Sequence, residues 1–289
     1  MTDTRIGHLG DPRHRAVPGI PPRGQKLRVV IDSDAKNEID DQWAIALAIL
    51  SLERLQIEGF VAANYDNAWG GPGGIERSKR EIELVLAKAS FGDRWPVLRG
   101  SHPLRYQFEP FASEGVDFIL DRAMAASPED PLWVVVLAAA TDMASAPLKE
   151  PRILGYVVAF WHLKTRWPEK CYNSNVFGDV RAARMLRCPM EESAELVRPY
   201  GELGAYLHEY RHQNPAYASP KKRFFDLGDI AALVEPKLAA WETVDCPEVD
   251  WDLDYHFTGK MGRTLGCHHV DRDRVFQLLF DKLKEHYGE

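Results

Sequence analysis

Short apolar runs alternate with amphipathic segments over most of the chain. Leu27–Ile31 is a β-branched run that predicts a strand, and the apolar stretch Trp43–Leu50 predicts a helix. Ile75–Ala89 carries apolar residues at the i, i+3, i+4 and i+7 positions of one helix face. Further strands are predicted at Gln56–Ala63, Leu132–Leu137 and Ile153–Phe160, and further helices near Glu114–Ala126, Asp142–Leu148, Asp179–Leu186 and Asp273–His286. Because strands alternate with helices, we expect an α/β fold whose mainly parallel sheet is covered by helices on both faces.

The pattern predicts a single domain. No internal repeat or low-complexity linker divides the sequence, and its Pro/Gly-rich segments punctuate loops. Residues 1–26 alternate Gly, Pro, Arg and His without an apolar run, so we expect them to form an irregular N-terminal arm. Residues 27–289 are expected to form the domain, with additional helices after about Tyr200 and a late strand pair around Gly262–Val270.

Composition narrows the classes of function. The 289 residues carry 36 Lys and Arg against 43 Asp and Glu, a formal net charge of -7 that argues against a nucleic-acid partner. Apolar runs such as Trp133–Ala140 are far shorter than the roughly 20 residues that cross a bilayer, so we expect no membrane partner. Four widely separated cysteines, and an N-terminus without the apolar segment of a secretory signal, predict a cytoplasmic protein with reduced thiols.

The most informative segment is the acidic stretch Asp32–Asp41 (DSDAKNEIDD), which directly follows the first predicted strand. It holds five carboxylates within ten residues, at the end of a strand where ligands bind in open α/β sheets. Like charges this close raise each other's pKa unless a cation compensates, and oxygen ligands favour calcium or magnesium over zinc. The alternative is that Asp40 and Asp41 cap the next helix, which is worth roughly 0.3 to 1 kcal/mol but explains only two of the five carboxylates.

The same stretch resembles the DxDPGxDD signature of the inosine-uridine nucleoside hydrolase superfamily. Asp32 and Asp34 match the first pair of aspartates, and Asp40 and Asp41 match the second. Five residues, Ala35–Ile39, separate the pairs in place of the usual three. This two-residue expansion gives an N-E-x-D-D form that is similar to the nucleoside hydrolase-like branch of the superfamily.

Further segments match the family in the same order along the chain. They are Val61–Asn64, Pro96–Leu104 (PVLRGSHPL), Ala138–Ala144 (AAATDMA), Asn175–Ala183 (NVFGDVRAA) and Phe225–Pro236 (FDLGDIAALVEP). Together the matches extend from about Leu27 to Glu285. The resemblance therefore implies a nucleoside hydrolase-like, Rossmann-like fold for nearly the whole chain.

The resemblance also implies a chemistry, which is calcium-dependent hydrolysis of the N-glycosidic bond of a nucleoside or a related small-molecule ribosyl compound. The implied metal ligands are Asp32, Asp34, Asp41, Asp226 and the backbone carbonyl of Thr141, and the implied ribose ligands are Asp40, Asn64 and Asn175. Asp34 is implied as the general base toward the attacking water. Family resemblance further suggests a homodimer or a homotetramer.

The proton donor for the leaving base is not where the resemblance would place it. Phe225 stands where purine-cleaving relatives have a His, and a phenyl ring cannot donate a proton. Trp161 and His162 replace small Gly residues of the family, so we expect Trp161 and Phe225 to border the base and His162 to be the catalytic acid. The alternative is that His162 packs against Trp161 or Trp167 and bonds to a backbone carbonyl.

Two other functions stay open. The expanded loop, Phe225 and Trp161 suggest a hydrolase of the same fold that acts on a different glycoside. A non-catalytic protein that binds calcium and a sugar is the second possibility. Within the expanded loop itself, Lys36 and Glu38 predict a salt bridge that closes the loop.

Overall fold

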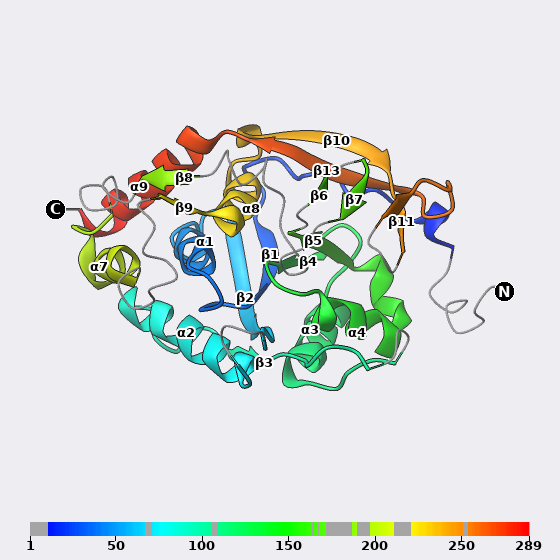
Figure 1. Ribbon diagram of the computed structural model, residues 1–289, viewed down its shortest axis with the longest axis horizontal. Helices are drawn as coiled ribbons and strands as arrows, with labels where there is room; N and C mark the ends of the chain where they lie inside the picture. The colour runs from blue at the N-terminus through cyan, green and yellow to red at the C-terminus, as the bar shows by residue number, and fades with distance from the viewer. Residues whose placement is uncertain are drawn as a thin grey trace.

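A parallel five-stranded sheet forms the centre of the protein. The computed structural model describes residues 11–66, 71–105, 109–162, 165–166, 168–171, 187–189, 197–210, 221–250 and 254–288. The sheet has the order β3-β2-β1-β4-β5 with every neighbouring pair parallel, as Figure 1 shows. Its strands are β1 (Leu27–Ser33), β2 (Leu55–Ala62), β3 (Val97–Arg99), β4 (Leu132–Val136) and β5 (Val157–Trp161). The strand order reverses between β1 and β4, and ligands bind at this point in open α/β sheets.

Helices cover both faces of the sheet. One face packs against α1 (Asp40–Ile49), α2 (Gly74–Lys88), α7 (Gly201–Glu209), α8 (Phe225–Val234) and α9 (Arg272–Tyr287), and the other against α3 (Glu114–Met124) and α4 (Thr141–Lys149) (Figure 1). Successive residues of β1 serve the two cores, because Val29 and Ile31 belong to the first and Val30 to the second. The predicted α/β fold with a parallel sheet between two helical layers is confirmed.

Short two-stranded sheets and 3-10 turns complete the architecture. The longest ribbon pairs β10 (Ala239–Asp245) with β13 (Arg263–Val270), so the segment Gly262–Val270 supplies one strand of the late pair and its partner lies earlier in the chain. The remaining elements are β6 (Thr165–Arg166), β7 (Lys170–Cys171), β8 (Arg187–Pro189), β9 (Lys221–Arg223), β11 (Glu248–Val249), β12 (Tyr255–His256) and the 3-10 turns η2 (Pro12–His14), η3 (Pro151–Gly155) and η6 (Pro236–Leu238). Within the described ranges, no helix has the length and apolar character needed to cross a membrane.

Two details differ from the elements predicted above. The segment Ile153–Phe160 does not form one strand, because its start belongs to η3 and only Val157–Trp161 is extended. Pro151 begins the turn and the Glu150 carboxylate accepts from the Arg152 amide, which favours a helical turn over a strand. The three-residue strand β3 was not predicted, since it is too short to show alternation. The helix predicted at Asp179–Leu186 lies outside the described residues.

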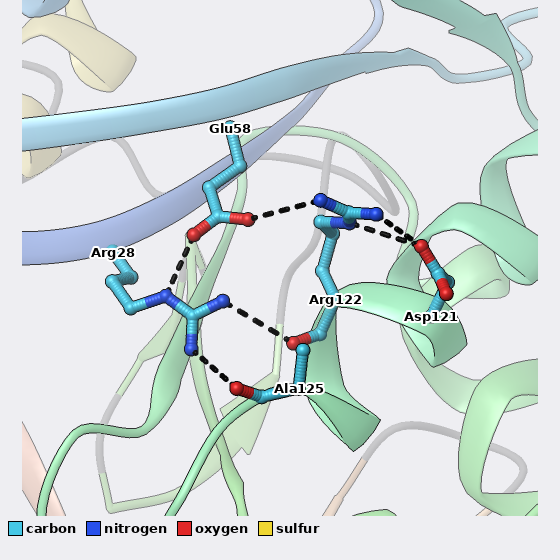
Figure 2. Close-up of polar contacts among 5 residues, drawn as sticks. All are labelled: Arg28, Glu58, Asp121, Arg122 and Ala125. Carbon is cyan, nitrogen blue, oxygen red and sulfur yellow. Dashed lines mark hydrogen bonds and ion pairs between the residues drawn. The ribbon is translucent and has the colours of Figure 1, made fainter.

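An ion-pair network joins the sheet to α3 on the face away from α1 (Figure 2). A register shift between Val29 and Val30 leaves Glu58 of β2 without a direct partner in β1. Glu58 instead accepts from Arg28 Nε at 2.6 Å and lies 3.9 Å from Arg122. Arg28 also donates to the carbonyl oxygens of Arg122 and Ala125, where α3 ends and its last carbonyls need partners.

Arg54 connects the segment before β1 to the domain. Its guanidinium is buried and donates from Nε to the Leu233 carbonyl of α8 at 2.9 Å. The remaining donors reach the carbonyls of Pro21 and Pro22 at 2.8 Å, and that of Gln25. A planar guanidinium can satisfy several carbonyls at once, so Arg54 fixes the path of the chain into the first strand.

Candidate metal and substrate site

The end of β1 places the acidic stretch at the middle of the sheet edge. Asp32 is in register with Val61 of β2 and Val136 of β4, and is fully buried. The chain then passes Asp34 and enters α1, whose first turn contains Asp40 and Asp41. All four aspartates are at most 5% exposed. The sequence therefore buries four carboxylates where the strand order reverses.

Helix α8 adds a fifth aspartate from a distant part of the chain. It packs along α1, and its first turn carries Asp226. Carboxylate oxygens of Asp40, Asp41 and Asp226 lie within 4.8 Å of one another. The Phe225 amide donates to Asp40 Oδ2 at 3.0 Å and so ties the two helices together at their N-termini. The positive ends of two helix dipoles thus face this carboxylate group and partly offset its charge.

Hydrogen bonds satisfy some of these carboxylates and leave others without a partner. Asp41 Oδ1 accepts from Ser33 Oγ at 2.6 Å, and Asp34 Oδ2 accepts from Asn37 Nδ2 at 2.8 Å. Both oxygens of Asp32 and Oδ1 of Asp40 are buried without a hydrogen-bond partner among the described residues. A buried carboxylate oxygen without a donor is costly, so these atoms require a proton or a cation.

Burial and mutual repulsion raise the pKa values of the group. Desolvation is the largest cause for Asp32, Asp41 and Asp226, whose pKa values lie well above the ordinary value. Neighbouring carboxylates add to it; for Asp226 these are first Asp40 and then Asp41. The pKa of Asp34 rises to about 7, again mainly through burial, while the hydrogen bond from Asn37 opposes the rise. In the absence of a cation, burial and repulsion thus favour the protonated form of these carboxyl groups.

The donor set fits a hard divalent cation. The converging atoms of Asp40, Asp41 and Asp226 are all oxygens, and Oδ1 of Asp40 is buried without a partner among the residues that the structure describes. Calcium accepts six to eight oxygen ligands in flexible geometry, which suits a group of closely spaced carboxylates. Asp40, which the resemblance assigns to ribose, lies in the same group as Asp41 and Asp226. Thr141 begins α4, directly after β4 at the same edge of the sheet.

Asp142 is a buried aspartate that the sequence reasoning did not single out. It accepts from the Ser101 amide at 3.1 Å, from Ser101 Oγ at 2.8 Å and from Ser113 Oγ at 3.0 Å. After burial, its charge is the largest cause of the raised pKa of Asp32. Asp142 therefore joins β3, the start of α3 and α4 behind the acidic group. The sequence did carry a signal for Asp142, because this residue directly follows Thr141, shortly after the predicted strand Leu132–Leu137.

Lys36 anchors the expanded loop to α2. Lys36 Nζ pairs with Glu81 Oε2 at 3.0 Å, so the expectation that Lys36 and Glu38 close the loop with a salt bridge is wrong. Glu81 is buried and also accepts from Gln42 Nε2 at 3.1 Å and from the Tyr206 hydroxyl. Lys36 has a φ of 80°, a left-handed conformation that is strained for a side-chain-bearing residue. The ion pair with a buried carboxylate stabilises that conformation.

His162 lies beside the acidic group and contacts α8. Its Nδ1 is 2.5 Å from Asp229 Oδ2, and its ring centroid is 6.1 Å from that of Phe225. The partner of the His162 ring is therefore a carboxylate. The alternative prediction, in which the ring bonds to a backbone carbonyl, does not describe this contact. Trp161 donates from Nε1 to the Ala138 carbonyl at 3.0 Å and is 40% exposed.

Of the two asparagines predicted to bind ribose, the structure describes Asn64 but not Asn175. Asn64 follows β2 at the carboxyl edge of the sheet, and its amide group lies 3.2 Å from Asp66 Oδ2. Asn175 falls outside the residues that the structure describes. Sequence reasoning also missed Asp229, although its position one turn after Phe225 and Asp226 was visible in the sequence.

Comparisons with known proteins identify the fold. No protein-family model and no curated protein matches the sequence. A plant nucleoside hydrolase superposes with a TM-score of 0.70 at 17% identity, over 90% of this chain and 99% of that chain. The inosine-uridine preferring nucleoside hydrolase from Bacillus anthracis superposes with a TM-score of 0.67 at 14% identity, over 90% and 100% of the two chains. The type III effector protein XopQ complexed with adenosine diphosphate ribose superposes with a TM-score of 0.61 at 17% identity, over 99% of this chain and 100% of that chain.

The protein therefore has a nucleoside hydrolase-like fold in a single domain. The resemblance that the acidic stretch indicated is confirmed at the level of the fold. The two-residue expansion of the first loop stays a prediction, because the comparisons do not address it.

Proposed function

We propose that the protein is a calcium-dependent hydrolase that cleaves the N-glycosidic bond of a nucleoside or a related ribosyl compound. The observation that carries the proposal is the convergence of the buried carboxylates of α1 (Asp40, Asp41) and α8 (Asp226), together with the buried Asp32 at the end of β1. Some of their oxygens have no partner within the described ranges. Nucleoside hydrolases that share the fold support the class of reaction.

The proposed calcium ligands are the carboxylates of Asp32, Asp34, Asp41 and Asp226 and the carbonyl of Thr141. The position of Asp40 beside Asp41 and Asp226 supports it as a further ligand of the ion or of a ribose hydroxyl held next to it. Calcium bound there would lower the pKa of a coordinated water. Its charge would also compensate the mutual repulsion that otherwise favours protonated carboxylates.

The residues of the chain have distinct proposed roles in the reaction. Asp34 accepts a proton from the attacking water, whose oxygen forms a bond to the anomeric carbon as the bond to the base nitrogen breaks. Asn64 and Asn175 hold ribose hydroxyls, and this orientation can be worth several kcal/mol of the barrier. Trp161 and Phe225 border the base, and His162 donates a proton to its departing nitrogen. The products are free ribose and the free base.

Substitution of Asp34 tests the proposal. Asp34→Asn keeps the size and an acceptor for Asn37 but removes the base and one anionic ligand. We expect hydrolysis to fall by at least about 10²-fold, as removal of a general base does. Isothermal titration should also show weaker calcium binding. Asp121→Asn, an exposed aspartate of α3, is the matched control and should change neither. Full activity in Asp34→Asn would contradict the role of this residue.

A second candidate is the hydrolysis of a ribosyl compound larger than a nucleoside. The complex of XopQ with adenosine diphosphate ribose supports this candidate. A panel of nucleosides and adenosine diphosphate ribose, each assayed chromatographically for the released base with and without calcium, separates these substrates. Cleavage of another glycoside while all ribosyl compounds stay intact would favour the alternative of a different glycoside. Calcium-dependent binding without turnover would favour a non-catalytic sugar-binding protein.

The proposal includes the state and location of the protein. We propose a homodimer or homotetramer, which light scattering of the purified protein measures directly. A cytoplasmic location is also proposed, and the wide separation of the four cysteines supports it.

A further inference from the structure

His162 and Asp229 form a pair at the edge of the acidic group. His162 follows β5, and Asp229 lies on α8, one turn after Asp226. Their side chains are only 13% and 19% exposed, and Nδ1 and Oδ2 are 2.5 Å apart. The other ring nitrogen, Nε2, is buried without a hydrogen-bond partner among the described residues. Asp229 thus holds one nitrogen of the imidazole, while the other nitrogen is available to a ligand.

Helix α8 holds the His162 ring through two residues, Phe225 and Asp229. Asp229 lies four residues after Phe225 and three residues after Asp226, so it shares a helix face with each of them. The Phe225 ring packs against the imidazole, and Asp229 holds its Nδ1. Ligand atoms of His162, Asp226 and Asp229 lie within 4.8 Å of one another. The same helical turn that brings Asp226 to the acidic group therefore brings His162 beside it.

A carboxylate at Nδ1 determines what Nε2 can do. An imidazole that donates from Nδ1 to a carboxylate has a fixed tautomer and a fixed ring orientation. When protonated, the ring donates from both nitrogens, one to the carboxylate and one to a substrate. Phe225 cannot take this role, although it occupies the first position of α8.

We propose that Asp229 is a positioning residue that orients His162, so that Nε2 delivers the proton to the departing base. The inference rests on the proposed N-glycosidic hydrolysis. In this step the bond between the anomeric carbon and the base nitrogen breaks, its electron pair stays on the base, and the proton on His162 Nε2 moves to that nitrogen. Asp229 keeps its hydrogen bond to Nδ1 throughout. The water proton goes to Asp34, and both side chains re-equilibrate with solvent after the products leave.

The test compares two leaving groups in the same enzyme. A nucleoside base needs a proton to leave, whereas the p-nitrophenolate of p-nitrophenyl β-D-riboside leaves as an anion. For Asp229→Asn we expect kcat on a cleaved nucleoside to fall roughly 10- to 100-fold with little change in KM. This is a part of the 10²- to 10⁴-fold that a general acid supplies. Activity on the nitrophenyl riboside should stay within about threefold, since that leaving group requires no acid.

A double-mutant cycle separates positioning from a structural effect. If Asp229 acts through His162, Asp229→Asn should cause almost no further loss of nucleoside hydrolysis in a His162→Gln background. Asp250→Asn is the matched control. Asp250 forms an exposed pair with His256, in which Oδ2 and Nε2 are 2.7 Å apart, and this pair lies away from the site. This control should leave both substrates unaffected. Thermal unfolding of each variant shows whether the fold is retained.

The outcomes distinguish this inference from the proposed function. Equal losses on both substrates in Asp229→Asn, or additive losses in the double variant, would overturn the positioning role while hydrolysis itself stands. If the wild-type protein cleaves no ribosyl compound, the proposed function fails first. Long-range ¹H–¹⁵N NMR then still tests the positioning role, because it reports which ring nitrogen of His162 carries the proton. Nδ1 should carry it in the wild type, and this preference should be lost in Asp229→Asn. An unchanged tautomer would overturn the inference.

Discussion

Removal of divalent cations should make the folded protein less stable as the pH rises from about 4 to about 7. Buried Asp34 has a pKa of about 7 in the folded protein, against an ordinary value of 3.8. Between these values the folded chain keeps a proton that the unfolded chain has lost. The free energy of unfolding must therefore fall as the pH rises through this window, and level off above it.

The magnitude follows from the width of the window. At about 1.4 kcal/mol per pH unit, the interval from pH 3.8 to about 7 corresponds to about 4 kcal/mol for Asp34 alone. This is a large part of the 5 to 15 kcal/mol that stabilises a typical domain. Calcium reverses the effect, because it binds the ionised carboxylates and so favours their loss of protons.

Urea unfolding between pH 5 and pH 8 measures this effect. In a chelator, the wild-type protein should lose at least about 2 kcal/mol between pH 5 and pH 7, because the raised pKa values of Asp32, Asp41 and Asp226 add to the effect of Asp34. Added calcium should abolish the loss. Asp34→Asn cannot titrate at this position, so it should lose distinctly less than the wild type in the same chelator. A wild-type free energy of unfolding that stays constant or rises over this range without calcium would refute the reasoning. The same slope in wild type and Asp34→Asn would refute the assignment to Asp34.

Three further predictions concern the framework that holds the site. Glu58→Gln should reduce the free energy of unfolding by about 1 to 3 kcal/mol, because it leaves the mostly buried guanidinium of Arg28 without its carboxylate. Gly100→Ala should cost about 1 to 3 kcal/mol, because a Cβ there would lie 2.5 Å from Asp142 Oδ2. Arg54→Met should cost about 3 kcal/mol or more and should expose the preceding segment to protease, because it removes the donors to several buried carbonyls. Urea unfolding and limited proteolysis measure these changes.

Matched substitutions outside these contacts serve as controls. Glu202→Gln breaks an exposed ion pair with Lys88, Gly155→Ala adds a Cβ with no atom within 4 Å, and Arg23→Met removes a largely exposed guanidinium. Each should unfold at the same urea concentration as the wild type. If Glu58→Gln, Gly100→Ala or Arg54→Met behaves like its control, the contact concerned does not stabilise the fold as argued.

The periodicity of the sequence was sufficient to predict the architecture. Apolar runs such as Leu132–Leu137 are too uniform for a sheet with one wet face, so they predict strands buried between helices. The acidic stretch Asp32–Asp41 was recognisable for a similar reason, since so many adjacent carboxylates are unfavourable unless something compensates them. Local sequence therefore determined the element types, the layers and half of the candidate site.

Contacts between distant segments were decided only by the tertiary structure. The packing of α8 on α1 brings Asp226 to Asp40 and Asp41, and no local pattern specifies which helices pack together. The partner of Lys36 is Glu81, 45 residues away, and not its neighbour Glu38. Side-chain pairing depends on burial and direction as well as on proximity in sequence, which is why the local expectation failed there.

The same distinction applies to the chemistry of the candidate acid. Residue types alone made His162 a candidate, because imidazole is the side chain whose ordinary pKa suits proton donation near neutral pH. Whether one ring nitrogen is held and the other left available depends on Asp229, which follows 67 residues later. Composition and periodicity determine what a segment becomes, because they act through neighbouring residues. The orientation of a side chain depends on the residues packed around it, and those are chosen by the fold.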